Sequence, residues 1–307
     1  NSTKDVKIFN SIGGSDVNVG STKVVTLNLV RHALESYGIV SNFIEEVKKS
    51  LDIIYKYHYA QRNCIKKLIS KGMLPLYSYD LMSLDDQFAT IGINGVFEAI
   101  KILGGIDETS SGYRYNNEGY TIAKDLFSLI NSFNSRTLNK YGYLSNVEQV
   151  PAESSALKLC KKDRLIFGNN VIDKELGEGY YIYGNQWIPL KENASLFARI
   201  DSAKLDRFCG GGAIQHINLG ERFQTSEDAY EFAIGLANAG VGYYSIIAIM
   251  DICKNDHTFF GDTCPICEGK SVDKGVKIVG YLVKSTSFKK ERKRELSERK
   301  FYNDPYK

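Results

Sequence analysis

Four potential metal ligands lie close together near the end of the chain, and they constrain its local fold more than any other feature. Cys264 and Cys267 form a Cys-x-x-Cys hook, in which two thiolates on a tight turn can face one ion. Cys253 and His257 precede the hook at a distance that lets a short loop close back on it. Three sulfurs and one imidazole complete a tetrahedral set, so the spacing predicts a structural Zn²⁺ site; ordinary buried thiols are the alternative.

Composition limits the remaining possibilities. A chain of 307 residues with 43% hydrophobic content can bury a large core, as one large domain or two smaller ones. The net charge of +3 gives no global reason to expect nucleic-acid binding. The basic run 289–294 is followed by Glu295 and Glu298 at helical spacing, which favours a solvated helix. Cysteines clustered as ligands indicate a reducing compartment, and no apolar run is long enough for a bilayer, so we expect a cytoplasmic protein without membrane association.

Strand-like and helix-like segments alternate along the chain, which predicts the α/β class. We expect strands at 24–30, 88–95, 143–150, 213–219 and from 240. We expect helices at 40–71, as one long helix or two, from 96, at 117–137, from 151 and at 225–239, the last with Ser226 or Thr225 as its cap. The aromatic stretch Tyr180–Trp187 is interpreted as an exposed connecting excursion. The glycines before the strand at 213–219 permit close approach of the backbone to a neighbour or a ligand.

Two places combine a strand with polar or small residues that can contact a ligand. Asn28 lies inside an apolar strand pattern, where it is either a structural hydrogen-bonding residue, the favoured interpretation, or a ligand contact. Pro151, Ala152, Glu153, Ser154 and Ser155 open a helix directly after a predicted strand. Free N–H groups and the helix dipole make such an N-terminus a candidate anion site, although a plain capped helix is commoner.

Several motifs, taken in this order, resemble the catalytic subunit of the anaerobic (class III) ribonucleoside-triphosphate reductases, a family of glycyl radical enzymes. The resemblance runs over nearly the whole chain and corresponds to the C-terminal part of that subunit. The matching segments are Thr26–Leu29 with Arg31, Leu74–Tyr77, Thr90–Gly95, Pro151–Ser154, Gly211-Gly212 with His216, the cysteine motif and Val279–Leu282.

The resemblance implies a fold: the C-terminal portion of a ten-stranded α/β barrel, followed by a small zinc-binding subdomain. Residues 1–245 would belong to the barrel, 246–270 to the zinc-binding module, and 271–307 to the radical loop and the tail. Gly280 would be the radical glycine, because a Cα radical is delocalised over the flanking amides only when no side chain impedes planarity. Lys277 stands where the family usually has an arginine, a mild departure.

The resemblance also assigns the remaining site residues. Cys253, Cys264 and Cys267 would bind zinc; many members have a fourth cysteine, and here Asp256 and His257 compete for that place, with imidazole the better partner for thiolate-bound zinc. The segment 151–155 would receive the substrate phosphates. Asn28 would lie beside the reacting ribose, where formate is proposed to sit in formate-dependent members.

The thiyl cysteine of the family should precede the strand that contains Asn28, but residues 1–27 contain no cysteine, and Cys64 comes too late. We therefore expect that this cysteine lies on another polypeptide or a removed segment, and that the chain is inactive alone. The implied partners are a ribonucleoside triphosphate, a radical S-adenosylmethionine iron–sulfur activase, the N-terminal part of the reductase and a second copy in a homodimer. The alternatives are another glycyl radical enzyme, a non-catalytic zinc module that binds nucleic acid through the basic tail, and an inactive remnant.

Overall fold

The computed structural model describes residues 20–277 and 282–303, which fall into two compact units. The first unit comprises residues up to 107, 114–187 and 204–213, and the second comprises 108–113, 188–203 and 214 onward. Strands β3 (Ile106–Thr109) and β4 (Gly112–Tyr115) contribute residues to both units.

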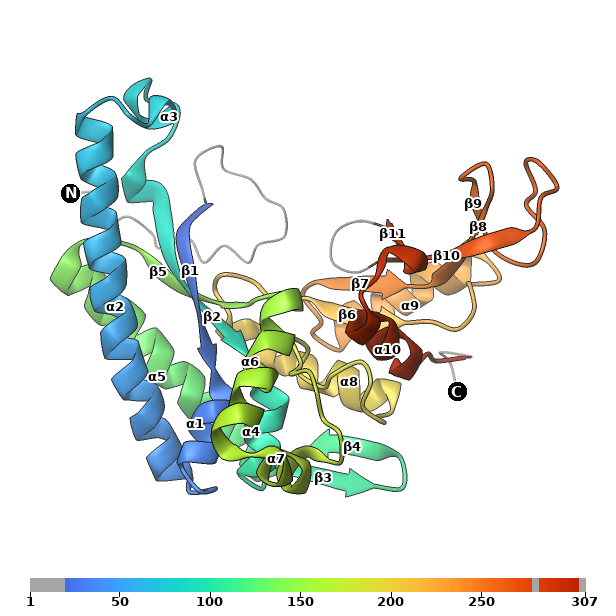
Figure 1. Ribbon diagram of the computed structural model, residues 1–307, viewed down its shortest axis with the longest axis horizontal. Helices are drawn as coiled ribbons and strands as arrows, with labels where there is room; N and C mark the ends of the chain where they lie inside the picture. The colour runs from blue at the N-terminus through green and yellow to red at the C-terminus, as the bar shows by residue number, and fades with distance from the viewer. Residues whose placement is uncertain (1–19, 278–281, 304–307) are drawn as a thin grey trace. The chain divides into compact units, whose positions relative to one another are not determined.

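The first unit alternates strands and helices, as the sequence predicts for the α/β class (Figure 1). Its other elements in chain order are β1 (Gly20–Asn28), α1 (Leu29–Glu35), α2 (Val40–Ser70), α3 (Pro75–Ser78), β2 (Gln87–Asn94), α4 (Val96–Ile102), α5 (Asn117–Tyr141), β5 (Ser145–Gln149), α6 (Glu153–Phe167) and α7 (Asn169–Leu176).

A parallel three-stranded sheet with the order β1-β2-β5 is the centre of this unit. Its register pairs Asn28 with Asn94 and Ile93 with Gln149, so the carboxyl ends of all three strands meet at one edge. Parallel neighbours need crossover connections, which α1 and α2 supply between β1 and β2, and α4 and α5 between β2 and β5. Ligands of open α/β sheets bind outside this carboxyl edge, which makes it the place to look for a site.

The helix predicted at 40–71 is confirmed as the single helix α2, which lies beside α5 (Figure 1). Its buried positions recur at helical spacing and include Phe43, Val47 and Leu51, each fully buried. An apolar stripe of this period covers one side of a helix and buries it against its neighbours.

The strand predicted at 24–30 ends earlier than expected, at Asn28. The side-chain oxygen of Asn28 accepts a hydrogen bond from the backbone N–H of Arg31 at 3.4 Å, as the N-cap of α1. Leu29 and Val30 therefore belong to a helix, where they are fully buried. An apolar run of this length does not distinguish a buried strand from a buried helical turn, which explains the error.

The interpretation of 180–187 as exposed is wrong, because Tyr183 and Trp187 are only 2% and 1% exposed. Each aromatic ring buries its apolar body while its polar atom finds a partner. The Trp187 Nε1 donates to Asp206 Oδ1 at 2.6 Å, and its ring meets Phe127 edge to face with centroids 5.9 Å apart. The stretch is therefore part of the core of the first unit.

The second unit contains a parallel pair, β6 with β7, and an antiparallel sheet with the order β11-β10-β8-β9. Helix α9 begins at a capping box in which Thr225 and Asp228 satisfy each other's backbone N–H groups, as expected from the cap signal. The elements are α8 (Leu196–Ser202), β6 (Gln215–Asn218), α9 (Ser226–Asn238), β7 (Tyr244–Ile247), β8 (Ile249–Cys253), β9 (Thr258–Phe259), β10 (Ser271–Lys277), β11 (Leu282–Lys284) and α10 (Lys290–Glu298).

These elements make the described chain a mixed α/β fold. Its parallel sheets have three and two strands, so a closed barrel is not seen among the residues that the structure describes. Within the same residues, every helix is too short or too polar to cross a lipid bilayer.

Candidate functional site

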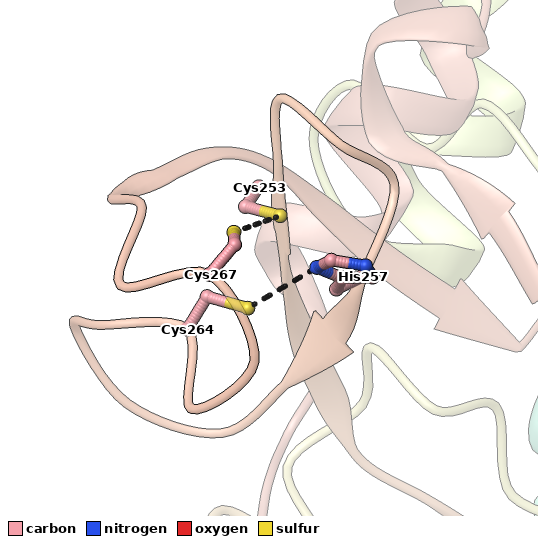
Figure 2. A group of neighbouring side chains, drawn as sticks. All are labelled: Cys253, His257, Cys264 and Cys267. Carbon is pink, nitrogen blue, oxygen red and sulfur yellow. Dashed lines mark hydrogen bonds between the residues drawn. The ribbon is translucent and has the colours of Figure 1, made fainter.

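The four predicted metal ligands converge in the second unit, with one ligand atom of each lying within 4.8 Å of the others (Figure 2). Cys253 Sγ lies 3.6 Å from Cys267 Sγ, and Cys264 Sγ lies 3.6 Å from His257 Nδ1. Zinc bonds of about 2.3 Å to sulfur and about 2.0 Å to nitrogen give tetrahedral edges of roughly 3.5–3.8 Å. These two separations therefore fit two edges of a zinc tetrahedron, and this three-cysteine, one-histidine group can hold zinc.

Two tight turns shape this metal group. In the first, the Asp256 N–H donates to the Cys253 carbonyl, and in the second the Glu268 N–H donates to the Cys264 carbonyl at 2.8 Å. Asp256 and Glu268 both have a positive φ, 62° and 55°, so each turn closes through a left-handed residue. A Cβ on Gly269 would lie 3.3 Å from Cys267 Sγ, so a glycine there leaves room for the thiolate.

The structure places His257 in this group and directs Asp256 elsewhere. The Asp256 carboxylate accepts from Lys284 Nζ at 2.5 Å, and its side chain is largely exposed. Cys253 and Cys264 are fully buried, and Cys267 packs against them together with Phe259. Buried thiolates need a compensating positive charge, which a metal ion would supply and a carboxylate, itself an anion, cannot.

The metal group is continuous with the strands on either side of the predicted radical glycine. Cys253 ends β8 and pairs with Ser271, the first residue of β10. At its other end, β10 pairs Lys277 with Leu282 of β11. Gly280 itself lies outside the described residues, so its role stays a prediction.

Asn28 lies at the carboxyl edge of the parallel sheet in the first unit, partly exposed. It makes the structural hydrogen bond of an N-cap, and its Nδ2 donates to Asp163 Oδ2 at 2.8 Å. Beside it, Asn94 is buried and its Nδ2 donates to the Gly184 carbonyl at 2.8 Å. Asn28 is thus both held by the fold and accessible, which agrees with a structural role and leaves a ligand contact open.

The predicted phosphate segment, Pro151 to Ser155, reaches the same edge because it follows directly after β5. Ala152 is the N-cap of α6, with a left-handed φ of 52°, and its side chain cannot accept a hydrogen bond from the first turn. Pro151 and Ser154 are exposed, Ala152 and Ser155 are half-buried, and Glu153 begins the helix. An N-terminus without a side-chain cap keeps its N–H groups available to an anion.

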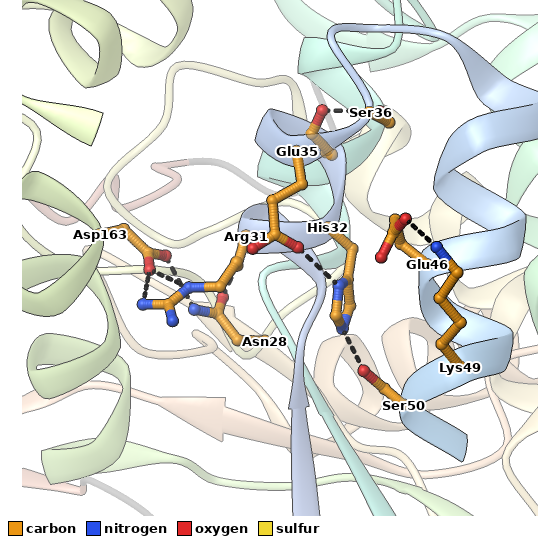
Figure 3. Close-up of polar contacts among 10 residues, drawn as sticks. Asn28, Arg31, His32, Glu35, Ser36, Glu46, Lys49, Ser50 and Asp163 are labelled. Carbon is orange, nitrogen blue, oxygen red and sulfur yellow. Dashed lines mark hydrogen bonds and ion pairs between the residues drawn. The ribbon is translucent and has the colours of Figure 1, made fainter. Parts of the chain in front are cut away.

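The sequence reasoning missed a buried polar network that includes Asn28. Asp163, on α6, is fully buried and accepts hydrogen bonds from Asn28 and Arg31 (Figure 3). It also accepts a hydrogen bond from Tyr183. The one available signal was an aspartate among the apolar positions of a helix, together with an arginine next to Asn28. Neither position predicts the other, because they are more than 130 residues apart.

The cysteines outside the metal group are poor candidates for a reactive thiolate. Burial raises the pKa of the Cys160 thiol to about 11. Burial also raises the pKa of Cys209 well above its usual value. Cys64 is exposed on α2, in the part of the chain that lies far from the metal ligands in sequence.

Together, the parallel sheet with polar residues at its carboxyl edge and the three-cysteine, one-histidine group define a mixed α/β protein with a group near its C-terminus that could hold a metal ion. Residues 3–302 match the family model described as anaerobic ribonucleoside-triphosphate reductase. The chain therefore belongs to the anaerobic (class III) ribonucleotide reductase family.

Solved structures support this membership. A structure described as an anaerobic ribonucleotide reductase is 40% identical, with a TM-score of 0.89, over 96% of this chain and 47% of its own. The Thermotoga maritima anaerobic ribonucleotide reductase with glycerol in its active site is 41% identical, with a TM-score of 0.85, over 94% of this chain and 46% of its own.

The same Thermotoga maritima enzyme has also been solved in complex with dATP and CTP, at 40% identity and a TM-score of 0.83, over 93% of this chain and 46% of that one. The chain spans about half the length of these structures. Among curated proteins no match is found.

Proposed function

We propose that this chain is the part of an anaerobic ribonucleoside-triphosphate reductase that supplies the radical glycine, the zinc site and one side of the substrate pocket. The complete enzyme would reduce ribonucleoside triphosphates to 2′-deoxyribonucleoside triphosphates. One observation supports this most: Asn28 and the segment 151–155, far apart in sequence, lie at the carboxyl edge of one parallel sheet. The nucleotide complex of the Thermotoga maritima relative is consistent with such a substrate.

Each residue would have a distinct role. The α6 N-terminus, at Ala152 to Ser155, would bind the phosphates through backbone N–H groups and the helix dipole. Asn28 would contact the ribose at the reacting carbons. Protein groups in such a site chiefly position the substrate and exclude water, while the radical performs the chemistry.

Gly280 would carry the radical, installed by a radical S-adenosylmethionine activase, and a thiyl cysteine from the N-terminal part would take the 3′ hydrogen of the ribose. The 2′ hydroxyl would leave as water, with electrons from formate or a dithiol system. Bound zinc would be structural, holding together the turns that precede β10. Residues 1–245 would form part of the catalytic barrel, 246–270 the zinc-binding module and 271–307 the radical loop and tail, within a homodimer of the complete subunit.

The ion pairs of the basic tail argue against the nucleic-acid-binding alternative. In α10, Arg292 and Arg299 both pair with the carboxylate of Glu295, and Arg294 pairs with Glu298. Burial alone would raise the pKa of Glu295, but the charges of Arg299 and Arg292 lower it below its usual value. Arginines that neutralise carboxylates of their own helix are poorly placed to bind phosphates.

Anaerobic electron paramagnetic resonance tests the proposal. The chain is combined with its N-terminal part, an activase, S-adenosylmethionine and a reductant, and Gly280→Ala serves as the control. We expect a doublet that disappears in the variant, followed by deoxyribonucleotide formation. Absence of a signal from an assembled, zinc-loaded complex would refute the radical assignment.

A further inference from the structure

A single buried carboxylate connects Asn28 with the helix that begins at the proposed phosphate segment. Asp163 lies in the third turn of α6 and its side chain has no exposed surface. Its Oδ2 accepts from Asn28 Nδ2 at 2.8 Å and from the Tyr183 hydroxyl at 2.9 Å, and its Oδ1 accepts from Arg31 Nε at 2.7 Å. A terminal nitrogen of Arg31 also bonds to Oδ1. Four donors thus occupy the roughly four lone-pair positions of the carboxylate.

This network fixes which way the amide of Asn28 faces. An ionised carboxylate only accepts hydrogen bonds, so Nδ2 of Asn28, and not Oδ1, must point toward Asp163. The Oδ1 atom of Asn28 is held on the other side of the amide, because it accepts a hydrogen bond from the Arg31 backbone N–H. One N–H and one carbonyl lone pair of Asn28, a partly exposed residue, then remain in a known orientation.

A purely structural role does not account for a charge at this position. Burying an ion pair costs more desolvation free energy than packing an apolar residue of similar size, and such pairs often contribute little net stability. Tyr183, which donates to Asp163, belongs to a buried cluster with Cys160, Val30 and Ile172. A carboxylate beside this cluster makes sense if the orientation that it imposes is needed.

We propose that Asp163 is a positioning residue that orients the amide of Asn28 toward the ribose of the substrate. The inference rests on the proposed function, since it assigns Asn28 to the substrate site. Because Asp163 and the phosphate segment belong to the same helix, α6 places both ends of the substrate relative to the sheet. Asp163 itself contacts no substrate and acts only through Asn28, with Arg31 as its charge partner.

The test compares Asp163→Asn with Asp173→Asn in the complete reductase, assembled with the N-terminal part and activated. Asp173 is a matched control, because it also pairs with an arginine, Arg164, but does not contact Asn28. In Asp163→Asn, the charge of Arg31 should attract the new amide oxygen, so the new NH2 faces Nδ2 of Asn28 and the acceptor that orients the Asn28 amide is lost. We expect kcat to fall about 100-fold, with KM for the ribonucleoside triphosphate changed less than about threefold, since only the reacting end of the substrate is affected.

Both kinetic constants of Asp173→Asn should stay within about threefold of the wild type. Circular dichroism and thermal unfolding show whether each variant is folded at the assay temperature. A folded Asp163→Asn variant with wild-type kcat refutes the inference about Asp163 but not the proposed function. An equal loss of kcat in Asp163→Asn and Asp173→Asn does the same. A wild-type assembly without turnover refutes the proposed function and with it this inference.

If Asp163→Asn does not fold, Tyr183→Phe answers the same question. This variant keeps the charge and the ring but removes one donor from Oδ2, which loosens the orientation of the carboxylate. We expect about a fivefold lower kcat at unchanged KM, the effect of one lost hydrogen bond. An unchanged kcat in a folded Tyr183→Phe variant would contradict the inference.

Discussion

Replacing Cys264 by serine removes one sulfur from the metal group, and the structure gives the expected size of the effect. The ligands Cys253 and Cys267 close a loop of fifteen residues. A cross-link across a loop of this length restricts the unfolded segment by about 3 kcal/mol. The apolar cluster beneath the loop contains few residues besides the cysteines, chiefly Phe259, so packing cannot replace the metal.

Native-state hydrogen exchange with parallel zinc analysis measures this effect. The wild type and Cys64→Ser, whose exposed thiol is outside the group, should bind one zinc per chain. Cys264→Ser should bind less, and amide protection in β8 and β10 should fall about 100-fold, the equivalent of that 3 kcal/mol. Equal protection in all three proteins, or no zinc in the wild type purified under reducing conditions, would refute the reasoning.

Two further predictions concern the stability of the first unit. His58 is fully buried and, among the described residues, neither ring nitrogen has a hydrogen-bond partner; burial, with Arg62 and Lys23, lowers its pKa to about 4. As the pH falls, the unfolded state takes up the proton first, so the free energy of unfolding should fall by about 3 kcal/mol from pH 6.5 to 4 relative to His58→Leu. Urea titrations measure this, and the same pH dependence of the unfolding free energy in both proteins would contradict the prediction. Gly92→Ala places a Cβ 2.7 Å from Thr26 Oγ1 and 2.8 Å from Val150 Cγ1 in the centre of the sheet. We expect the free energy of unfolding, measured with denaturant, to fall by about 1–3 kcal/mol. Gly142→Ala, with no atom near its Cβ, is the control that tests only backbone strain.

The sequence predicted what depends on local patterns. Apolar periodicity identified α2, and the cap signal, Ser226 or Thr225, located the start of α9 within a residue, with Thr225 as the observed cap. The metal group was accessible for the same reason, because all four ligands lie within one short segment and their spacing is characteristic. The glycines at 211 and 212 were correctly read as allowing close backbone approach: the Gly211 N–H donates to the Val147 carbonyl at 2.8 Å.

What the sequence could not predict depends on partners far apart in the chain. The Tyr183 hydroxyl finds its partner in Asp163, and nothing in the aromatic stretch at 180–187 reveals such a partner. The early end of β1 depends on Asn28 as a cap, in a run whose apolar residues fit either element. Tertiary contacts decided both cases, and local propensity is silent about them.

Helix α6 also determines which changes of sequence this part of the chain can accept. One rigid helix joins Ser155, in the proposed phosphate segment, to Asp163. An insertion or deletion of one residue between them would turn Asp163 by about 100° and shift it by about 1.5 Å, away from Asn28. Substitutions at Leu165 or Ile166, which are 86% and 59% exposed, change neither the rotation nor the axial position of Asp163. Along this helix, therefore, the outer side chains are free to diverge among relatives, while the number of residues between these two positions is not.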